Sequence, residues 1–253
     1  MTIPGTPTWS RTTGARNSAC DEPRAQQVIK AILPPEVIAA EAFGDVPGGT
    51  LFPAEEAAIA RAVDKRRREF STGRACAHAA LVTLGVPPAP ILRGPQGAPE
   101  WPDGVVGSIT HCAGYRAAAV ARAREMLTVG VDAEPDEPLP DGVLDRIAVA
   151  EERAWLREEG GSVPGANWDR LLFSAKESVY KAWFPLTGRW LGFEEAVITI
   201  DPAAGGFTAR LLVPGPVIGG QPVTAFSGRW AAGRGLVLTA VAVPRTAAAP
   251  GRI

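Results

Sequence analysis

The sequence lacks the features that mark membrane-spanning and secreted proteins. No apolar run among its 253 residues approaches the roughly 18 residues that a bilayer span requires. The first residues also lack the basic start and apolar segment of a secretory signal. Its three cysteines, Cys20, Cys76 and Cys112, are scattered and odd in number, which favours a reducing compartment over a disulfide scaffold. We therefore expect a cytoplasmic protein that does not bind membranes.

The chain also has little net charge and little lysine. A formal charge of −1 gives no general attraction to nucleic acid. Only four of the 26 basic residues are lysines, and two of these, Lys176 and Lys181, lie close together around Glu177. Because lysine can lose a proton at a working pKa and arginine cannot, this cluster is a candidate site.

The pattern of apolar residues predicts an α+β fold. Helical periodicity covers residues 53–84, 143–159 and 167–184, the last ending before Pro185. Strand patterns follow in two groups, the first expected to form a three-strand meander: 105–111, 115–123 and 127–134, then 194–200, 206–213, 224–232 and 236–243. Helix followed by antiparallel strands thus occurs twice, which indicates two similar halves packed together. We place them at residues 28–131 and 132–253, with the site at their seam and a mobile tail at residues 1–27.

An acidic pair lies at the end of one predicted strand. Asp132 and Glu134 are two residues apart, so both carboxylates point to the same face of the strand. Closely spaced carboxylate oxygens are ligands that Mg²⁺ prefers, together with water and phosphate oxygens. Two solvent-facing acids at a strand end are the alternative, and the spacing leaves it open.

The second acidic candidate lies on a predicted helix. Glu177 and Lys181 are four residues apart and share a face of that helix. Such pairs are usually solvated, but here the flanks are apolar and aromatic. Glu177 could complete a metal site or act as a base, with Lys181 as its electrostatic partner or as an acid.

Basic residues on the first predicted helix suit capture of a phosphate. Arg66, Arg67, Arg68 and Arg74 recur on successive turns, and a guanidinium can bind phosphate in a bidentate manner. Helical periodicity does not decide which of them faces a ligand. His111, at a strand end, is a candidate phosphate contact or a structural residue. The sequence has no phosphate loop, dinucleotide-binding fingerprint or nucleophile elbow.

Three blocks together resemble the signature of the 4′-phosphopantetheinyl transferases of the surfactin/enterobactin-synthetase type. They are the sequences GSITH at 107–111, GVDAE at 130–134 and FSAKESVYKAW at 173–183. The segments RRREFSTGRACA at 66–77, PILRG at 90–94 and WPDG at 101–104 are similar to the mycobacterial-type branch. The resemblance covers about residues 51–243 and implies an intramolecular pseudo-dimer.

The resemblance implies an enzyme that transfers the 4′-phosphopantetheine arm of CoA to a serine of an apo carrier protein and releases 3′,5′-ADP. It implies a Mg²⁺ ion, with Mn²⁺ as a substitute, held by Asp132, Glu134 and Glu177. Glu177 would also act as the base and Lys181 would stabilise the departing 3′,5′-ADP. The CoA-binding residues that it implies are Arg66, Arg74, Arg93, Thr110, His111, Lys176 and Lys181; Arg93 stands where close relatives are expected to have lysine.

The segment after the last helix is a candidate surface for the carrier protein. Arg189, Trp190 and Leu191 combine an apolar centre with a basic rim, although a core-packing loop is an equal alternative. The expected partners are acyl, aryl or peptidyl carrier proteins, and a chain with two built-in halves is expected to be a monomer. A Mg²⁺-dependent nucleotide or CoA phosphohydrolase and a non-catalytic module that binds CoA or carrier proteins remain as other interpretations.

Overall fold

The computed structural model describes residues 28–46, 51–160 and 165–245, so the predicted tail at residues 1–27 lies outside it. The helices are α1 (Pro53–Ala58), α2 (Asp64–Thr83), α3 (Val143–Ile147), α4 (Ala150–Trp155) and α5 (Trp168–Thr187). The strands are β1 (Ile38–Phe43), β2 (Val105–Cys112), β3 (Tyr115–Arg122), β4 (Met126–Pro135), β5 (Ala196–Asp201), β6 (Gly206–Leu211), β7 (Val217–Ile218), β8 (Gln221–Pro222), β9 (Ala225–Gly233) and β10 (Leu236–Pro244). In these ranges no helix has the length and apolar character needed to cross a bilayer.

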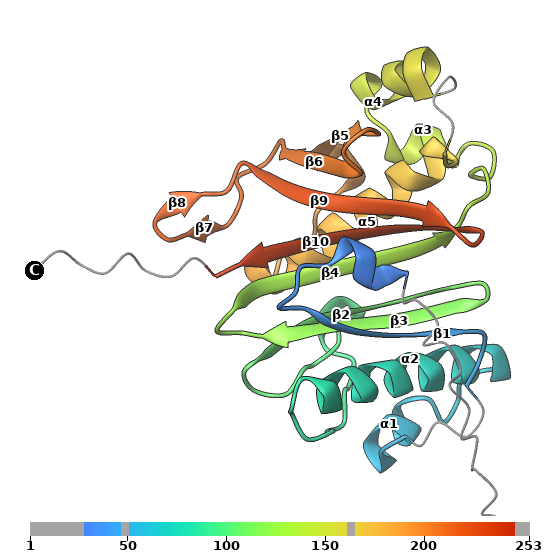
Figure 1. Cartoon of the computed structure of the whole chain (residues 1–253), viewed down its shortest axis with the longest axis vertical. Helices are drawn as coiled ribbons and strands as arrows, with labels where there is room; N and C mark the ends of the chain where they lie inside the picture. Colours follow the sequence, from blue (N-terminus) through green and yellow to red (C-terminus); the bar gives the residue numbers. More distant parts are fainter. Residues whose placement is uncertain (1–27, 47–50, 161–164, 246–253) are drawn as a thin grey trace, which may run out of the picture.

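The strands form two main antiparallel sheets (Figure 1). The first has the order β1-β3-β2 and the second the order β4-β10-β9-β6-β5, while β7 and β8 form a separate small hairpin. The predicted α+β class with two helix-and-sheet parts is therefore confirmed. The predicted meander is wrong in its third strand, because β4 pairs with β10 along its length and not with β3.

Each sheet is covered by one long helix. On the first sheet, Ala118 and Val120 of β3 pack against Ala77 and Leu81 of α2. The apolar side of α5 packs against the second sheet in the largest core of the described chain. A further core lies on the other face of both sheets, where alternate residues of β3, β4 and β10 meet a short 3-10 turn at Ile29–Ile32. The alternation along each strand thus fills cores on both of its faces.

The two sheets meet at β2 and β4, where side chains replace a backbone ladder. Ser108 Oγ accepts a hydrogen bond from the backbone N–H of Val131 at 3.1 Å. Two residues further along each strand, Thr110 Oγ1 accepts one from Ala133 N at 3.0 Å. Two hydroxyl-bearing residues of one block therefore fix the seam to the next block.

Two glycines of these blocks allow close packing within the parts of the fold on either side of the seam. A Cβ atom at Gly130 would lie 2.1 Å from the carbonyl oxygen of Ser178, so β4 can approach α5 this closely only without a side chain there. A Cβ atom at Gly107 would lie 2.9 Å from the ring of Trp101. That indole also donates from Nε1 to Gly107 O at 3.0 Å. Both glycines are required by space and not by a positive φ angle.

The first predicted helix is broken into α1 and α2. Helix α1 ends at Ala58, and the next residue, Ile59, is buried with Leu51 and Phe70 in a small core of their own. The guanidinium of Arg67 donates to Ile59 O at 2.8 Å and so satisfies a carbonyl at this break. The sequence pattern does not predict the break at 59–63, because apolar and charged residues continue through it with helical spacing.

Other boundaries also differ from the predicted ones. The helix predicted at 143–159 is two short helices, α3 and α4, followed by a π-helical turn. Helix α5 runs past Pro185, since a proline in the last turn removes a single N–H, and ends at Gly188 in the left-handed conformation with φ +63°. Strand β1 was not predicted. The proposed division of the chain at 131/132 falls inside β4, which belongs wholly to the second sheet.

Candidate active site

The acidic pair on β4 faces α5 at the seam. Asp132 lies opposite Thr239 of β10, and Glu134 lies opposite Val237. Both carboxylates reach partners on α5, as their spacing on one strand face predicts. The sheet therefore fixes where these two acids lie relative to the helix that carries Glu177.

Asp132 is 4% exposed and both of its carboxylate oxygens have protein donors. Lys181 Nζ lies 2.6 Å from Oδ1, and the hydroxyl of Thr110 donates to the same oxygen at 3.3 Å. Ser174 Oγ donates to Oδ2 at 2.8 Å and lies 2.9 Å from Thr239 Oγ1. Groups from β2 and α5 thus hold the carboxylate from two sides.

Glu134 is held by Arg170, one turn before the predicted block on α5. The guanidinium donates from Nη1 to Glu134 Oε2 at 3.1 Å and also to the carbonyl oxygens of Glu137 and Pro138. Burial raises the pKa of Glu134 to about 7, with a further rise from the charge of Asp132 and an opposing effect of Arg170. This carboxyl therefore takes up a proton near neutral pH.

Glu177 and Lys181 both line a cleft of about 500 Å³ between α5 and β2. Burial raises the pKa of Glu177; the positive charge of Lys181 opposes this and the negative charge of Asp132 adds to it. The cleft is also lined by backbone and side chains of Val105–Ile109, by the 96–99 turn and by Tyr180. A carboxyl with a raised pKa and an ammonium group therefore face one open volume.

Four predicted CoA-binding residues line a second pocket, of about 120 Å³. Arg66 and Arg74 come from α2, Arg93 from the loop after it and His111 from the end of β2. The pocket and the cleft share Gly97, Pro99 and Ile109, so the two volumes adjoin. The structure thus brings together residues that are up to 45 positions apart in the chain.

Arg66 and His111 are in direct contact in this pocket. Arg66 Nη1 lies 3.0 Å from His111 Nε2, so the imidazole nitrogen accepts and the ring is neutral. Burial and the charge of Arg66 both lower the pKa of His111. A bound anion would meet one permanent cation here, and its charge would favour the protonated form of His111, which burial and Arg66 disfavour.

Arg74 is almost completely buried at the back of the pocket. Its Nε atom donates to Ile91 O at 2.7 Å, and its guanidinium lies over the ring of Phe70 at 4.3 Å. Burial lowers the pKa of Arg74 to about 10, while the charge of Glu55 raises it. The group remains a cation at neutral pH.

Two predicted CoA contacts lie elsewhere. Thr110 is buried against Asp132 and does not line the pocket of His111. The ammonium of Lys176 donates to the carbonyl oxygens of Phe193 and Ala196 and pairs with Glu152 Oε1 at 2.9 Å. With its side chain 3% exposed, Lys176 has a structural role in place of the predicted phosphate contact.

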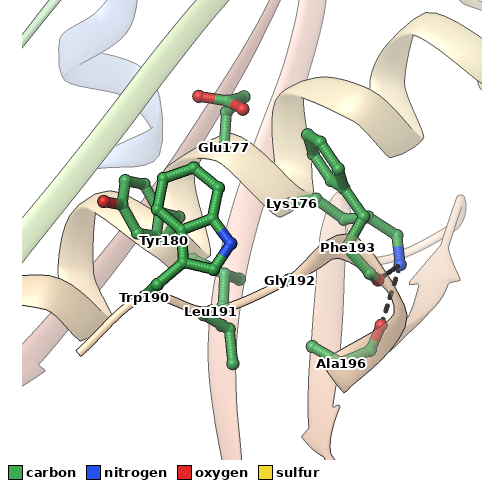
Figure 2. A pocket seen from close by; sticks show the side chains of 9 residues that line it. Lys176, Glu177, Tyr180, Trp190, Leu191, Gly192, Phe193 and Ala196 are labelled. Atoms are coloured by element: carbon green, nitrogen blue, oxygen red, sulfur yellow. Dashed lines mark hydrogen bonds between the residues drawn. The ribbon is translucent and has the colours of Figure 1, made fainter. Parts of the chain in front are cut away.

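A small apolar pocket of about 80 Å³ lies on the other side of Glu177 (Figure 2). Trp190 packs on Tyr180 with 4.8 Å between ring centroids, and Leu191 and Phe193 line the same pocket. Glu177 and Tyr180 line both this pocket and the large cleft. The hydroxyl oxygen of Tyr180 is buried without a hydrogen-bond partner among the described residues.

The predicted carrier-docking residues divide into two kinds. Trp190 is 64% exposed, as a docking residue must be. Leu191 is 7% exposed and belongs to the main core, which corrects its place in the predicted surface. Arg189 lies over the ring of Trp183 and donates to Pro214 O, so part of its side chain anchors the loop.

The three predicted metal ligands have the right chemistry for a divalent cation, but their side chains are not grouped around one point. Asp132, Glu134 and Glu177 offer carboxylate oxygens, which Mg²⁺ prefers. Among the described residues, however, no three or more His, Cys, Asp or Glu side chains are grouped closely enough to hold a metal ion. Lys181 and Arg170 instead neutralise two of the acids. Binding of the ion would require these partners to share or release their carboxylates.

Several residues of the site were not predicted. Ser174 and Tyr180 lie inside the quoted block on α5, but only the packing reveals that they face Asp132 and the cleft. Arg170 lies seven residues before Glu177 on the same helix, but nothing in the sequence distinguishes it from an ordinary surface arginine. The sequence predicts that Glu55 is an ordinary acid in the first turn of a helix, yet its side chain is fully buried beside Arg74.

Comparison with known proteins identifies the two parts of the chain. Residues 54–121 match the model of the 4′-phosphopantetheinyl transferase N-terminal domain, and residues 128–232 match the 4′-phosphopantetheinyl transferase superfamily. The chain is 58% identical over 219 residues to 4′-phosphopantetheinyl transferase Svp of Streptomyces mobaraensis, covering 85% of this chain and 89% of that protein.

Two further relatives cover the same share of the chain. It is 52% identical over 223 residues to 4′-phosphopantetheinyl transferase PptT of Mycobacterium tuberculosis, covering 85% of this chain and 97% of that protein. It is 50% identical over 223 residues to 4′-phosphopantetheinyl transferase Npt of Nocardia iowensis, covering 85% and 99%.

Fold, site and relatives together define a group-transfer enzyme with an acidic and a cationic part in adjoining clefts. The chain belongs to the 4′-phosphopantetheinyl transferase superfamily. It transfers phosphopantetheine from CoA, its substrate, to carrier proteins. The family and activity that the three sequence blocks implied are confirmed.

Proposed function

We propose that the transfer takes place in the cleft between α5 and β2, with CoA extending into the adjoining cationic pocket. One observation carries this proposal: Glu177 and Lys181 line the cleft, while Arg66, Arg74, Arg93 and His111 line the pocket beside it. CoA has phosphates at its nucleotide end and a diphosphate at the reacting end. A site for it needs cations at one place and reactive groups at another, a short distance away.

In this arrangement the cationic pocket binds and orients the nucleotide phosphates. Arg66 and Arg93 are accessible, and Arg74 supplies a fixed charge from behind. Guanidinium groups form strong charge-assisted hydrogen bonds with phosphate. Binding energy gained here holds the diphosphate against α5, which is the positioning that phosphoryl transfer requires.

Glu177 takes the proton of the carrier serine as the serine oxygen attacks the β-phosphorus. A carboxyl with a raised pKa is a stronger base than an ordinary one. The bond from the β-phosphorus to the bridging oxygen breaks, and 3′,5′-ADP leaves with the electron pair. Lys181, 26% exposed toward the cleft, stabilises the charge that develops on the departing group.

Asp132, Glu134 and Glu177 would hold Mg²⁺ when CoA is bound. The ion would supply neutralisation of the diphosphate charge. The ion pairs with Lys181 and Arg170 keep these acids paired when CoA is absent. The protein residues thereby avoid the repulsion of unpaired carboxylates that share one site.

The carrier protein meets the enzyme at the exposed side of Trp190. This indole lies beside Tyr180, whose helix also carries Glu177. A carrier bound there brings its serine to the mouth of the cleft, and the small apolar pocket beside Glu177 offers space for the apolar part of the phosphopantetheine arm. Acyl, aryl and peptidyl carrier proteins are the partners to test.

Intact mass of an apo carrier protein, incubated with the enzyme, CoA and Mg²⁺, tests this assignment. We expect the carrier to gain one phosphopantetheine arm, the gain to stop with a chelator and to be lost in Glu177→Gln. A Glu177→Gln enzyme with unchanged rate would remove the base from the mechanism. CoA consumed without carrier modification would indicate the phosphohydrolase, and CoA binding without either reaction would indicate the binding module.

A further inference from the structure

A buried carboxylate outside the cleft connects two of the segments that form the cationic pocket, helix α2 and the loop that leads to Arg93. Glu55, in the first turn of α1, has an exposed fraction of 0%. Its Oε1 atom accepts from the backbone N–H of Ile91 at 2.9 Å and lies 3.1 Å from His78 Nε2. The same oxygen lies 3.8 Å from Arg74 Nε. Its Oε2 atom accepts from the backbone N–H of Phe52 at 2.9 Å.

Glu55 and Arg74 hold the backbone of one residue from both sides. Glu55 accepts from Ile91 N–H, and Arg74 Nε donates to Ile91 O at 2.7 Å. Ile91 is itself fully buried, so its backbone has a fixed place in the fold. Arg93 follows two residues later, where its backbone forms a bridge with Pro99. The grip on Ile91 therefore determines where the Arg93 side chain begins.

The same carboxylate compensates the charge of Arg74. Burial and the neighbouring charges of Arg93 and Arg66 all lower the pKa of Arg74, and among its neighbours Glu55 raises it. Three guanidinium groups in one small pocket repel each other when no anion is bound. A buried negative charge behind Arg74 makes their assembly less costly.

A stabilising role alone does not account for Glu55. Replacing a buried ion pair by apolar residues of similar volume is often neutral or stabilising, so such a pair is weak support for a stability function. Nor does Glu55 line the cleft or the pocket. Of its partners, Arg74 lines the pocket directly, and Ile91 lies two residues before Arg93, which also lines the pocket.

We infer that Glu55 is a positioning residue for CoA binding, which acts by fixing Arg74 and the Ile91–Arg93 segment. This inference rests on the proposed assignment of the cationic pocket to CoA phosphates. It makes a specific prediction: loss of the Glu55 charge weakens binding of the nucleotide end of CoA and leaves the chemistry on α5 unchanged.

The test measures binding of 3′,5′-ADP by calorimetry to the full chain and its variants. This ligand contains the nucleotide phosphates and lacks the arm, so no transfer reaction can contribute to the signal. We expect Glu55→Gln to raise Kd about five- to tenfold, the loss of roughly one charge-assisted interaction. The fitted stoichiometry separates this from misfolding, since unfolded protein lowers the number of sites and leaves Kd unchanged.

Two matched controls define the effect. Glu56→Gln changes the next residue, which is exposed and paired with Arg67, and should leave Kd unchanged. Glu152→Gln changes an equally buried carboxylate in the other half, which accepts from the backbone N–H groups of Val149 and Ile198. It should lower the stability and leave the Kd of 3′,5′-ADP unchanged. Equal weakening by Glu55→Gln and Glu152→Gln would overturn the inference, because both would then act through general destabilisation.

Arg66→Ala and Arg93→Ala separate this inference from the pocket assignment. If both variants bind 3′,5′-ADP as the parent does, the assignment of the pocket is wrong. If both weaken binding and Glu55→Gln does not, the pocket is correct and the positioning role is wrong. Steady-state kinetics give a second readout: Glu55→Gln should raise KM for CoA with kcat and the KM for the carrier retained.

Should Glu55→Gln not fold, Glu55→Asp provides the same test with the charge kept. The shorter side chain withdraws the carboxylate from Ile91 N while leaving a negative charge near Arg74. We expect a weaker rise in Kd than for Glu55→Gln, of about two- to fivefold. An unchanged Kd in Glu55→Asp, with Arg93→Ala weakened, would contradict the inference equally.

Discussion

Lys181 Nζ lies 2.6 Å from Asp132 Oδ1, and this ion pair joins the helix and the strand that carry the acidic part of the site. Asp132 is nearly inaccessible, whereas the Lys181 side chain is 26% exposed and borders the cleft. One ammonium group therefore neutralises a buried carboxylate and also lines the cleft. In the mechanism that we propose, structure and catalysis depend on the same atom.

Lys181→Ala should impair both functions. We expect kcat for transfer to fall about a hundredfold, the loss typical of one stabilising group at a developing charge. The free energy of unfolding should fall by about 2 kcal/mol, because Asp132 loses its cation but keeps the hydroxyl donors Thr110 and Ser174. Transfer kinetics and urea unfolding measure the two effects, with the exposed Lys65→Ala as control. Retention of kcat in Lys181→Ala would contradict the role in catalysis.

Because of Glu134, the free energy of unfolding should fall as the pH rises, when a chelator keeps metal ions away from this carboxyl. Its folded-state pKa of about 7 lies above the usual carboxyl value of 4.5. Between these values the folded carboxyl keeps a proton that the unfolded one has lost, so the contribution is full below about pH 4.5 and lost as pH rises through 7. The upper limit of the effect is about 3 kcal/mol. Urea unfolding from pH 4.5 to 8 should show a flatter profile in Glu134→Gln; identical profiles would contradict the raised pKa.

Gly130→Ala should destabilise the fold severely. The added Cβ would lie 2.1 Å from Ser178 O and 2.6 Å from Ala182 N, both backbone atoms of α5 that cannot move alone. Moving the helix away from β4 should cost more than about 3 kcal/mol. Thermal unfolding measures this loss against Gly233→Ala, where nothing lies within 4 Å of the new Cβ. A Gly130→Ala protein as stable as the control would show that β4 and α5 do not pack this closely.

The sequence predicted elements and residue types better than it predicted their partners. All four strands of the second group and helix α5 appear within a few residues of their expected bounds, and the helix predicted at 53–84 contains α2 but starts at Asp64 after a break. Pairing is a property of distant segments, so local alternation could not reveal that β4 joins β10. Strand β1 has no alternation of buried and exposed residues, since only Ala39 is buried and most of its other residues are half-buried, so it gave no strand signal.

The same limit applies to the site. Asp132, Glu177 and Lys181 could be selected from their spacing and from the shortage of lysine. Lys176 satisfies the same criteria, yet it is buried against Glu152, because helical position decides which of two lysines faces the cleft. Glu55 could not be found at all, since its burial depends on contacts with residues 78 and 91.

Trp190 and Leu191 are adjacent but should respond differently to truncation. Trp190 is 64% exposed, so Trp190→Ala should leave stability nearly unchanged and raise KM for the carrier about tenfold, as loss of an aromatic interface residue often does. Leu191 lies in the core, and Leu191→Ala should cost about 3 kcal/mol in unfolding free energy. The KM for CoA should stay constant in Trp190→Ala.

A matched control for this pair is Val82→Ala, which removes an exposed apolar side chain from α2, the helix that covers the first sheet. It should change neither stability nor carrier KM. If Trp190→Ala also left the carrier KM unchanged, residues 189–191 would serve only to close the core over α5, and the carrier would have to approach Glu177 from another side. A rise in carrier KM confined to Trp190→Ala would instead place the partner on the exposed indole, directly beside the helix that carries Glu177.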